Sequence, residues 1–264
     1  MPILYLPDLL LAEGRVHAGT GLLVDSRGRV AGTAAPASLA DSVPDTGIVR
    51  LSGKALLPGL ANAHSHTFQR LFRARAEGRA TGGDTFWTWR EQMYRAAAFA
   101  SPEDLYDVAR ATFLEMLATG ITVVGEFHYL HNDPEGRPYA DPNLLAREVI
   151  RAAQSTGIRI CLLRCAYLRA GFQREPHPGQ RRFYEDAAGY LRNLDALLGA
   201  LAAEPSSDGK VTAGAAPHFS LHSHGHGLPK GEPVPKMRIA RCKHAARSRR
   251  DRRQGRPGYH ACPG

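Results

Sequence analysis

The sequence predicts an α/β fold of about four parallel βα units, with a small β domain before them and a basic tail after them. Residues 56–218 alternate between apolar, strand-like runs and helical stretches of about a dozen residues, a pattern typical of βαβ units. Residues 1–55 contain short strand-like runs separated by turn residues. Residues 219–264 are rich in Arg, Gly, Pro and His and lack apolar periodicity, so we expect this tail to be disordered.

The N-terminal part is predicted to be all-β. A strand at 19–24 leads to a turn at 25–28, residues 29–32 continue after the turn, and a further strand covers 48–51. The start of the chain lacks the basic region of a signal peptide, and no apolar stretch is long enough to span a bilayer. We therefore expect a cytoplasmic protein that has no membrane partner.

The βα region shows clear start and stop signals. Ser101 is a suitable N-cap, Pro102 suits the first turn, and Glu103 and Asp104 lie where the helix dipole favours acids. The sequence therefore predicts a helix over 101–118. The other predicted elements are strands at 56–66, 121–129, 158–167 and 210–218, and helices at 142–156 and 182–203.

The apolar run 56–66 ends in two histidines, His64 and His66, separated by one residue. Alternate residues of a strand point to the same face, so both imidazoles can bind one metal ion. The alternative is a turn with two exposed histidines. The apolar residues before the pair, with Pro58 and Gly59 where a chain would enter a barrel, favour the metal site.

Several stretches carry a family resemblance. The sequence LPGLANAHSH at 57–66 resembles the metal-binding signature of the amidohydrolase superfamily, in which the H-x-H pair ends the first barrel strand. The stretches HSHTFQ (64–69), FWTWR (86–90), GEFHY (125–129) and APH (216–218) resemble the N-formimino-L-glutamate deiminases of histidine degradation, and the resemblance stops near His218. It implies a TIM-type (β/α)8 barrel, here incomplete, and a small β-sandwich formed by residues 1–55.

The resemblance also implies an activity. In it a zinc ion, one per site, activates water for attack on the formimino carbon, giving N-formyl-L-glutamate and ammonia. The implied metal ligands are His64 and His66. The implied substrate contacts are Gln69, Arg90, Tyr129 and His218, with Arg90 on a carboxylate. From the residues alone, Gln69 and Tyr129 are polar wall residues, Arg90 lies on a solvated helix face, and His218 is a core histidine; these alternatives stay open.

Other parts of the family pattern are missing. A later histidine ligand, a glutamate proton shuttle, another histidine and a final aspartate have no counterparts here, so no general acid is identifiable. We therefore expect this chain alone to be inactive. The change of composition after His218 favours a shifted reading frame.

The net charge of +9 resides in the tail. Residues 219–264 hold eleven Lys or Arg against Glu232 and Asp251, which gives +9, and the rest of the chain is neutral. A polyanion-binding fragment is therefore one alternative function, although a basic run is more often simply solvated, and we expect no specific nucleic-acid partner. The other alternative is a heterocycle deaminase of the same superfamily. We expect a small-molecule substrate, and the resemblance is compatible with a homo-oligomer.

Overall fold

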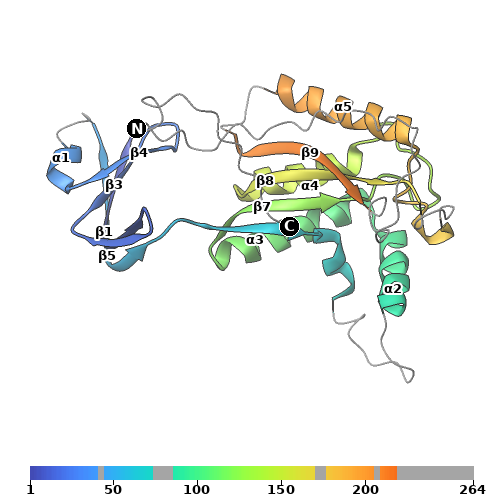
Figure 1. The fold of residues 1–264 in the computed structure, drawn as a ribbon, viewed down its shortest axis with the longest axis horizontal. Helices are drawn as coiled ribbons and strands as arrows, with labels where there is room; N and C mark the ends of the chain where they lie inside the picture. The colour runs from blue at the N-terminus through green and yellow to red at the C-terminus, as the bar shows by residue number, and fades with distance from the viewer. Residues whose placement is uncertain (41–44, 74–85, 170–176, 205–208, 219–264) are drawn as a thin grey trace, which may run out of the picture. The chain divides into compact units, whose positions relative to one another are not determined.

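The computed structural model of the 264-residue chain describes residues 1–40, 45–73, 86–169, 177–204 and 209–218. Two β-sheets organise these residues (Figure 1). The tail at 219–264 lies outside the described residues, so its expected disorder stays a prediction. Among the described helices, none is long and apolar enough to cross a membrane.

The N-terminal sheet has five strands. Its elements are β1 (Ile3–Ala12), β2 (Arg15–Ala18), β3 (Gly21–Val24), β4 (Val30–Ala34), the short helix α1 (Pro36–Ala40) and β5 (Gly47–Leu56). β1 pairs antiparallel with β2 and β3 and parallel with β5. Leu4, Leu23 and Leu39 form its core. The predicted β character of 1–55 is confirmed apart from the short helix α1; the described residues there form a single sheet, and the expected sandwich stays a prediction.

Strand β1 is central to this sheet, although the sequence did not predict it. Pro7 and Asp8 interrupt its apolar run, and the pairing with β5 shifts register between Pro7 and Leu9. Asp8 Oδ2 accepts a hydrogen bond of 2.8 Å from the backbone N–H of Gly53. Gly53 has a φ of +72°, which glycine adopts without a steric penalty. A contact between residues far apart in sequence thus stabilises the irregular stretch, and no local pattern reveals it.

The second sheet consists of four parallel strands in chain order, as a singly wound barrel requires (Figure 1). They are β6 (Leu60–Ser65), β7 (Ile121–His128), β8 (Arg159–Tyr167) and β9 (Val211–His218). The connecting elements are η1 (Thr67–Phe72), α2 (Phe86–Phe99), α3 (Pro102–Ala118), α4 (Leu144–Thr156), η2 (Pro178–Gln180) and α5 (Ala187–Ala203). The predicted α/β class with an incomplete barrel is confirmed.

Two clusters of buried side chains hold the parallel sheet to its helices. On one face, α3, α4 and α5 contribute Phe113, Val149 and Leu197, which pack with Val124 of β7 and Leu162 of β8. The second cluster lies where β7 and β8 end, and it joins these strand ends to η1 and α2. Its members include Phe68, Phe72, Met93, Tyr94, Tyr129, Tyr167 and Phe183. This second cluster surrounds the predicted site residues.

The helix boundaries follow the capping residues. Helix α3 begins after Ser101, whose Oγ accepts from the N–H of Asp104 at 3.1 Å, while Asp104 Oδ2 accepts from the N–H of Ser101 at 2.9 Å. This capping box confirms the helix predicted at 101–118. The prediction of a helix starting at 182 was wrong, because α5 begins at Ala187 with Asp186 as its N-cap.

Arg182 explains the error at the start of α5. Its side chain is 2% exposed, and its guanidinium donates to the carbonyl oxygens of Asn132, Ala97 and Ala100. These carbonyls belong to other parts of the chain, so residue 182 is fixed by tertiary contacts. A helix-compatible sequence therefore stays outside the helix.

We expect Gly59→Ala to destabilise the chain by about 1–3 kcal/mol, because a Cβ there would overpack the entrance to β6. An added Cβ would lie 2.1 Å from Oγ1 and 2.4 Å from Cγ2 of Thr122. Gly199→Ala in α5 is the matched control: nothing lies within 4 Å of its added Cβ, and helix propensity predicts a gain of about 0.5–1 kcal/mol. Urea unfolding followed by circular dichroism measures both; equal stability of Gly59→Ala and wild type would contradict this packing.

Candidate active site

His64 and His66 lie at the C-terminal end of β6. The strand ends at Ser65, and His66 is the residue before η1. Their Nε2 atoms lie 3.0 Å apart, and the two ring planes are nearly perpendicular, at 89°. Two nitrogen ligands of a tetrahedral zinc ion, each about 2.05 Å from the metal, would lie about 3.3 Å apart. The two rings therefore converge in a way that suits a shared metal ion.

The backbone of β7 fixes the orientation of the His66 ring. Its Nδ1 lies 2.8 Å from the carbonyl oxygen of Phe127. Because a carbonyl can only accept, Nδ1 carries the proton, and the Nε2 of the neutral ring keeps its lone pair for a ligand role. Burial lowers the pKa of His66, whereas the Phe127 carbonyl acts in the opposite direction. A backbone carbonyl on the second ring nitrogen is a common arrangement for metal-binding histidines.

Gln69 and Tyr129 lie together beside His66. Gln69 Nε2 donates to the Tyr129 hydroxyl at 2.8 Å, and the ring centres of Tyr129 and His66 are 5.0 Å apart, in an edge-on arrangement. The Tyr129 hydroxyl lies 3.4 Å from the Met93 sulfur, which is a weak acceptor. Burial raises the pKa of Tyr129, so its hydroxyl stays protonated at physiological pH.

Arg90 and His218 are less fully defined. Arg90 is half-buried on α2, and its guanidinium carbon lies 5.6 Å from the ring centre of Tyr94. His218 ends β9, where its backbone is opposite Tyr167 of β8. The side chain of His218 lies outside what the structure describes. A role for either residue in substrate binding stays a prediction.

The sequence motifs assign no role to Glu126 and His128, two residues of β7 within the GEFHY stretch. Both side chains are buried. Glu126 Oε1 accepts from the backbone N–H of Thr67 at 2.6 Å and from its hydroxyl at 2.8 Å. Burial raises the pKa of Glu126 to about 7, against hydrogen bonds from Thr67 and Ser65 that lower it. The GEFHY stretch was the signal, but the partner of Glu126 cannot be deduced from it.

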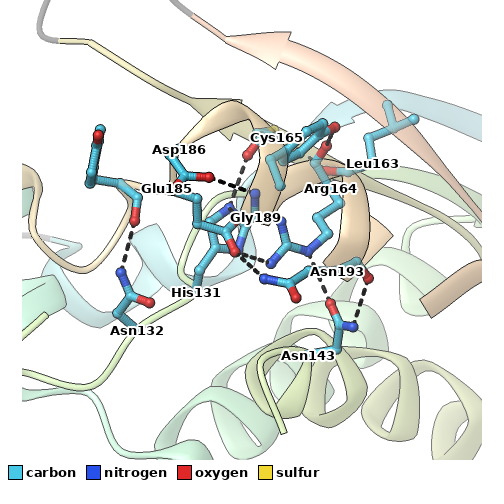
Figure 2. A network of polar contacts seen from close by, with 12 residues as sticks. His131, Asn132, Asn143, Leu163, Arg164, Cys165, Glu185, Asp186, Gly189 and Asn193 are labelled. Carbon is cyan, nitrogen blue, oxygen red and sulfur yellow. Dashed lines mark hydrogen bonds and ion pairs between the residues drawn. The ribbon is translucent and has the colours of Figure 1, made fainter. Parts of the chain in front are cut away.

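A buried polar network lies on the helix-covered side of β8 (Figure 2). Arg164 is fully buried, pairs with Glu185 through both terminal nitrogens, and donates from Nε to Asn143 Oδ1 at 3.0 Å. Glu185 Oε1 also accepts from Asn193 Nδ2 at 2.6 Å. Because Asn143 precedes α4 and Asn193 belongs to α5, the network joins β8, both helices and the segment before α5.

That segment completes the surroundings of Tyr129. Phe183 packs edge-on against Tyr129, with ring centres 5.2 Å apart. Gln180 is buried and donates to the Tyr94 hydroxyl at 3.0 Å. The ion pair of Arg164 and Glu185 therefore helps to fix the wall next to the predicted site.

Residues 55–227 match the amidohydrolase family, which is well over half of the 264 residues. The chain belongs to the amidohydrolase family. The match extends past His218, where the resemblance noted from the sequence stops. Over 175 residues the chain is 46% identical to formimidoylglutamate deiminase of Pseudomonas aeruginosa, covering 65% of this chain and 38% of that protein. It is 33% identical over 79 residues to 8-oxoguanine deaminase of the same organism, covering 30% and 17%.

Solved amidohydrolase structures share the fold. An amidohydrolase from Brucella melitensis superposes with a TM-score of 0.68 at 31% identity, covering 80% of this chain and 45% of that one. Atrazine chlorohydrolase from Arthrobacter aurescens, crystallised with zinc, gives a TM-score of 0.62 at 23% identity, covering 81% and 46%. The chain thus spans about two fifths of the length of the relatives it matches.

The residues of this amidohydrolase chain fit part of a metal centre. His64 and His66 supply two imidazole nitrogens, a donor type that suits zinc. Within the described ranges there is no group of three or more His, Cys, Asp or Glu side chains placed to hold a metal ion. Catalytic zinc ordinarily has three protein ligands and one open position. The described part therefore offers two imidazoles that fit such a centre, and their role as ligands stays a prediction.

We expect zinc to shift the 15N signals of His64 Nε2 and His66 Nε2 together, because the two atoms face one point. His17, exposed on β2, is the internal reference whose signals stay in place. Side-chain NMR of the 264-residue chain during a zinc titration resolves these rings from the histidines of the tail. His66→Ala should weaken zinc binding at His64 by about tenfold or more. Movement of either ring without the other would contradict a shared ion.

Proposed function

We propose that a protein containing this chain is a metal-dependent deiminase that hydrolyses N-formimino-L-glutamate to N-formyl-L-glutamate and ammonia. The observation that carries the proposal is that His64, His66, Gln69 and Tyr129 lie together at the ends of β6 and β7. These residues belong to the stretches that resemble the deiminases. The 46% identity to a formimidoylglutamate deiminase supports the same substrate.

In this proposal His64 and His66 would hold one zinc ion, and that ion would supply activation of water for attack on the formimino carbon. The Phe127 carbonyl orients the His66 ring for this role by accepting a hydrogen bond from Nδ1. The zinc complex of the related atrazine chlorohydrolase supports the choice of metal. The remaining ligands and the general acid lie outside the described residues of this chain.

Gln69 and Tyr129 would orient the substrate. The Tyr129 hydroxyl accepts from Gln69 Nε2 and lies 3.4 Å from the weakly accepting Met93 sulfur. A substrate oxygen is a much better hydrogen-bond acceptor than a thioether. The Tyr129 hydroxyl would therefore donate its hydrogen bond to the substrate. Arg90 would bind a carboxylate through its planar guanidinium, and His218 would contact substrate from the end of β9.

We also propose the domain limits 1–55, 56–218 and 219–264, because β5 ends at Leu56 and β9 ends at His218. A cytoplasmic location, a small-molecule substrate and a homo-oligomer belong to the same proposal. Binding of polyanions by the tail stays a prediction of its charge alone.

The 264-residue chain itself should show no turnover. Two imidazoles fall short of the three protein ligands usual for catalytic zinc, and proton transfer to the leaving nitrogen needs a general acid. The assay adds zinc and N-formimino-L-glutamate and follows ammonia release. A rate above that of the His64→Ala, His66→Ala double variant, from a monodisperse sample, would contradict this expectation.

A fusion tests the proposed substrate. Residues 1–218 would be joined to the remaining part of the Pseudomonas formimidoylglutamate deiminase, and we expect the fusion to release ammonia from N-formimino-L-glutamate. Tyr129→Phe should lower kcat/KM by about tenfold, the effect of one hydrogen bond to substrate. The fusion carrying His64→Ala and His66→Ala is the inactive control. A folded, zinc-loaded fusion that deaminates 8-oxoguanine and not N-formimino-L-glutamate would overturn the proposal.

A further inference from the structure

We propose that Glu126 is a positioning residue for the metal centre: it anchors Thr67 and thereby fixes the orientation of His66. The inference rests on the proposed function only in taking His66 as a metal ligand. It assigns a role to a residue that neither the sequence motifs nor the implied chemistry required.

Glu126 contacts both neighbours of His66: Ser65, whose hydrogen bond lowers the pKa of Glu126, and Thr67. One carboxylate oxygen, Oε1, accepts from both the backbone N–H and the hydroxyl of Thr67, at 2.6 and 2.8 Å. Glu126 is 1% exposed and Thr67 is 2% exposed, so water does not compete for these bonds. Two short hydrogen bonds in a dry site fix the backbone at Thr67, and with it the direction in which His66 leaves β6.

The pairing of β7 with the end of β6 is irregular. Asn62 is opposite Val124 and Ser65 is opposite Glu126, so three steps on β6 match two steps on β7. This bulge brings the Ala63 carbonyl oxygen within 2.9 Å of where a Gly125 Cβ would lie, and only glycine leaves that space. The bulge therefore leaves the ends of the two strands dependent on specific contacts for their alignment.

Glu126 acts through Thr67 and does not itself face the metal. Strand alternation places Glu126 on the opposite face of β7 from Phe127, and the Phe127 ring lies 4.3 Å from the His64 ring, centre to centre. The backbone carbonyl of Phe127 accepts a hydrogen bond from Nδ1 of His66, and Glu126 accepts one from the backbone N–H of Thr67. Two adjacent residues of β7 thus fix two adjacent residues after β6.

Burying a carboxylate at a strand end lowers the free energy of unfolding, because desolvation of its charge opposes folding. Burial indeed raises the pKa of Glu126. An apolar residue at this position would avoid that penalty, but it could not accept two hydrogen bonds from Thr67. The need for a fixed ligand orientation explains why a carboxylate is present.

The test uses the 264-residue chain with Glu126→Leu, Glu126→Gln, and Glu148→Leu as a control that removes a carboxylate from α4. The readout is the 15N signals of the His66 ring, which report its tautomer, and the zinc affinity from their titration. Glu126→Leu should give a mixture of His66 tautomers and weaken zinc binding by about 10–100-fold, as loss of an orienting partner does. Glu126→Gln, whose amide oxygen can accept both bonds, should restore the wild-type tautomer.

Thr67→Val and Thr67→Ser provide a second pair if Glu126→Leu does not fold. Thr67→Val loses the hydroxyl bond and should weaken zinc binding, whereas Thr67→Ser keeps both bonds and should match wild type. Wild-type tautomer and zinc affinity in Glu126→Leu, or in Thr67→Val where Leu fails to fold, would overturn the inference while leaving the proposed function intact. Altered tautomers in a chain whose wild type binds no zinc would instead overturn the metal centre and keep the anchoring role.

Discussion

The pairing of β6 with β7 is the constraint on which the site depends. It puts the end of β6, where His64 and His66 lie, beside Glu126 and Phe127 of β7 and beside Tyr129, the residue after β7. Each of these residues makes a different contact. Glu126 accepts hydrogen bonds through a buried carboxylate, Phe127 accepts one through its backbone carbonyl, and Tyr129 packs edge-on against His66. The bulge in β6 means that the regular ladder alone does not set the histidine geometry. The geometry of the site therefore depends on residues of β7 as much as on the two histidines at the end of β6.

A buried ion pair between Arg164 and Glu185 stabilises the segment that packs beside Tyr129. Arg164 and Glu185 form a buried pair whose desolvation cost is offset only because Asn143 and Asn193 complete the hydrogen bonding. Removing one partner of such a pair typically costs about 3–5 kcal/mol, because the other charge stays buried. The pair also fixes the segment that carries Phe183 against Tyr129. A network in which neither His64 nor His66 takes part thus helps to shape the space beside them.

Local signals in the sequence were sufficient for elements whose stability is local. The capping box of Ser101 and Asp104 predicted α3, and the apolar run before His64 predicted the strand. Strand β1 was not predicted, because the bond between Asp8 and Gly53 that stabilises it joins residues far apart in the sequence. The helix was predicted to start too early, because Arg182 is fixed by carbonyls more than eighty residues away. Strand alternation gives the face of β7 on which Glu126 lies, but its partner Thr67 is 59 positions away. Periodicity gives the direction of a side chain, and only the tertiary fold supplies its contact.

The start of β6 is exposed at the open edge of the parallel sheet. Leu57 and Leu60, at its start, are 59% and 61% exposed, which is unusual for large apolar side chains at the entrance to a barrel strand. In the described part β6 pairs with β7 alone, so its other edge carries unpaired backbone groups next to these leucines. In a closed barrel the same edge would meet the last strand, and that closure would bring further residues opposite His64, the more exposed of the two histidines. In the described part, the exposed apolar start of β6 and the exposed His64 thus lie along the same open edge of the sheet.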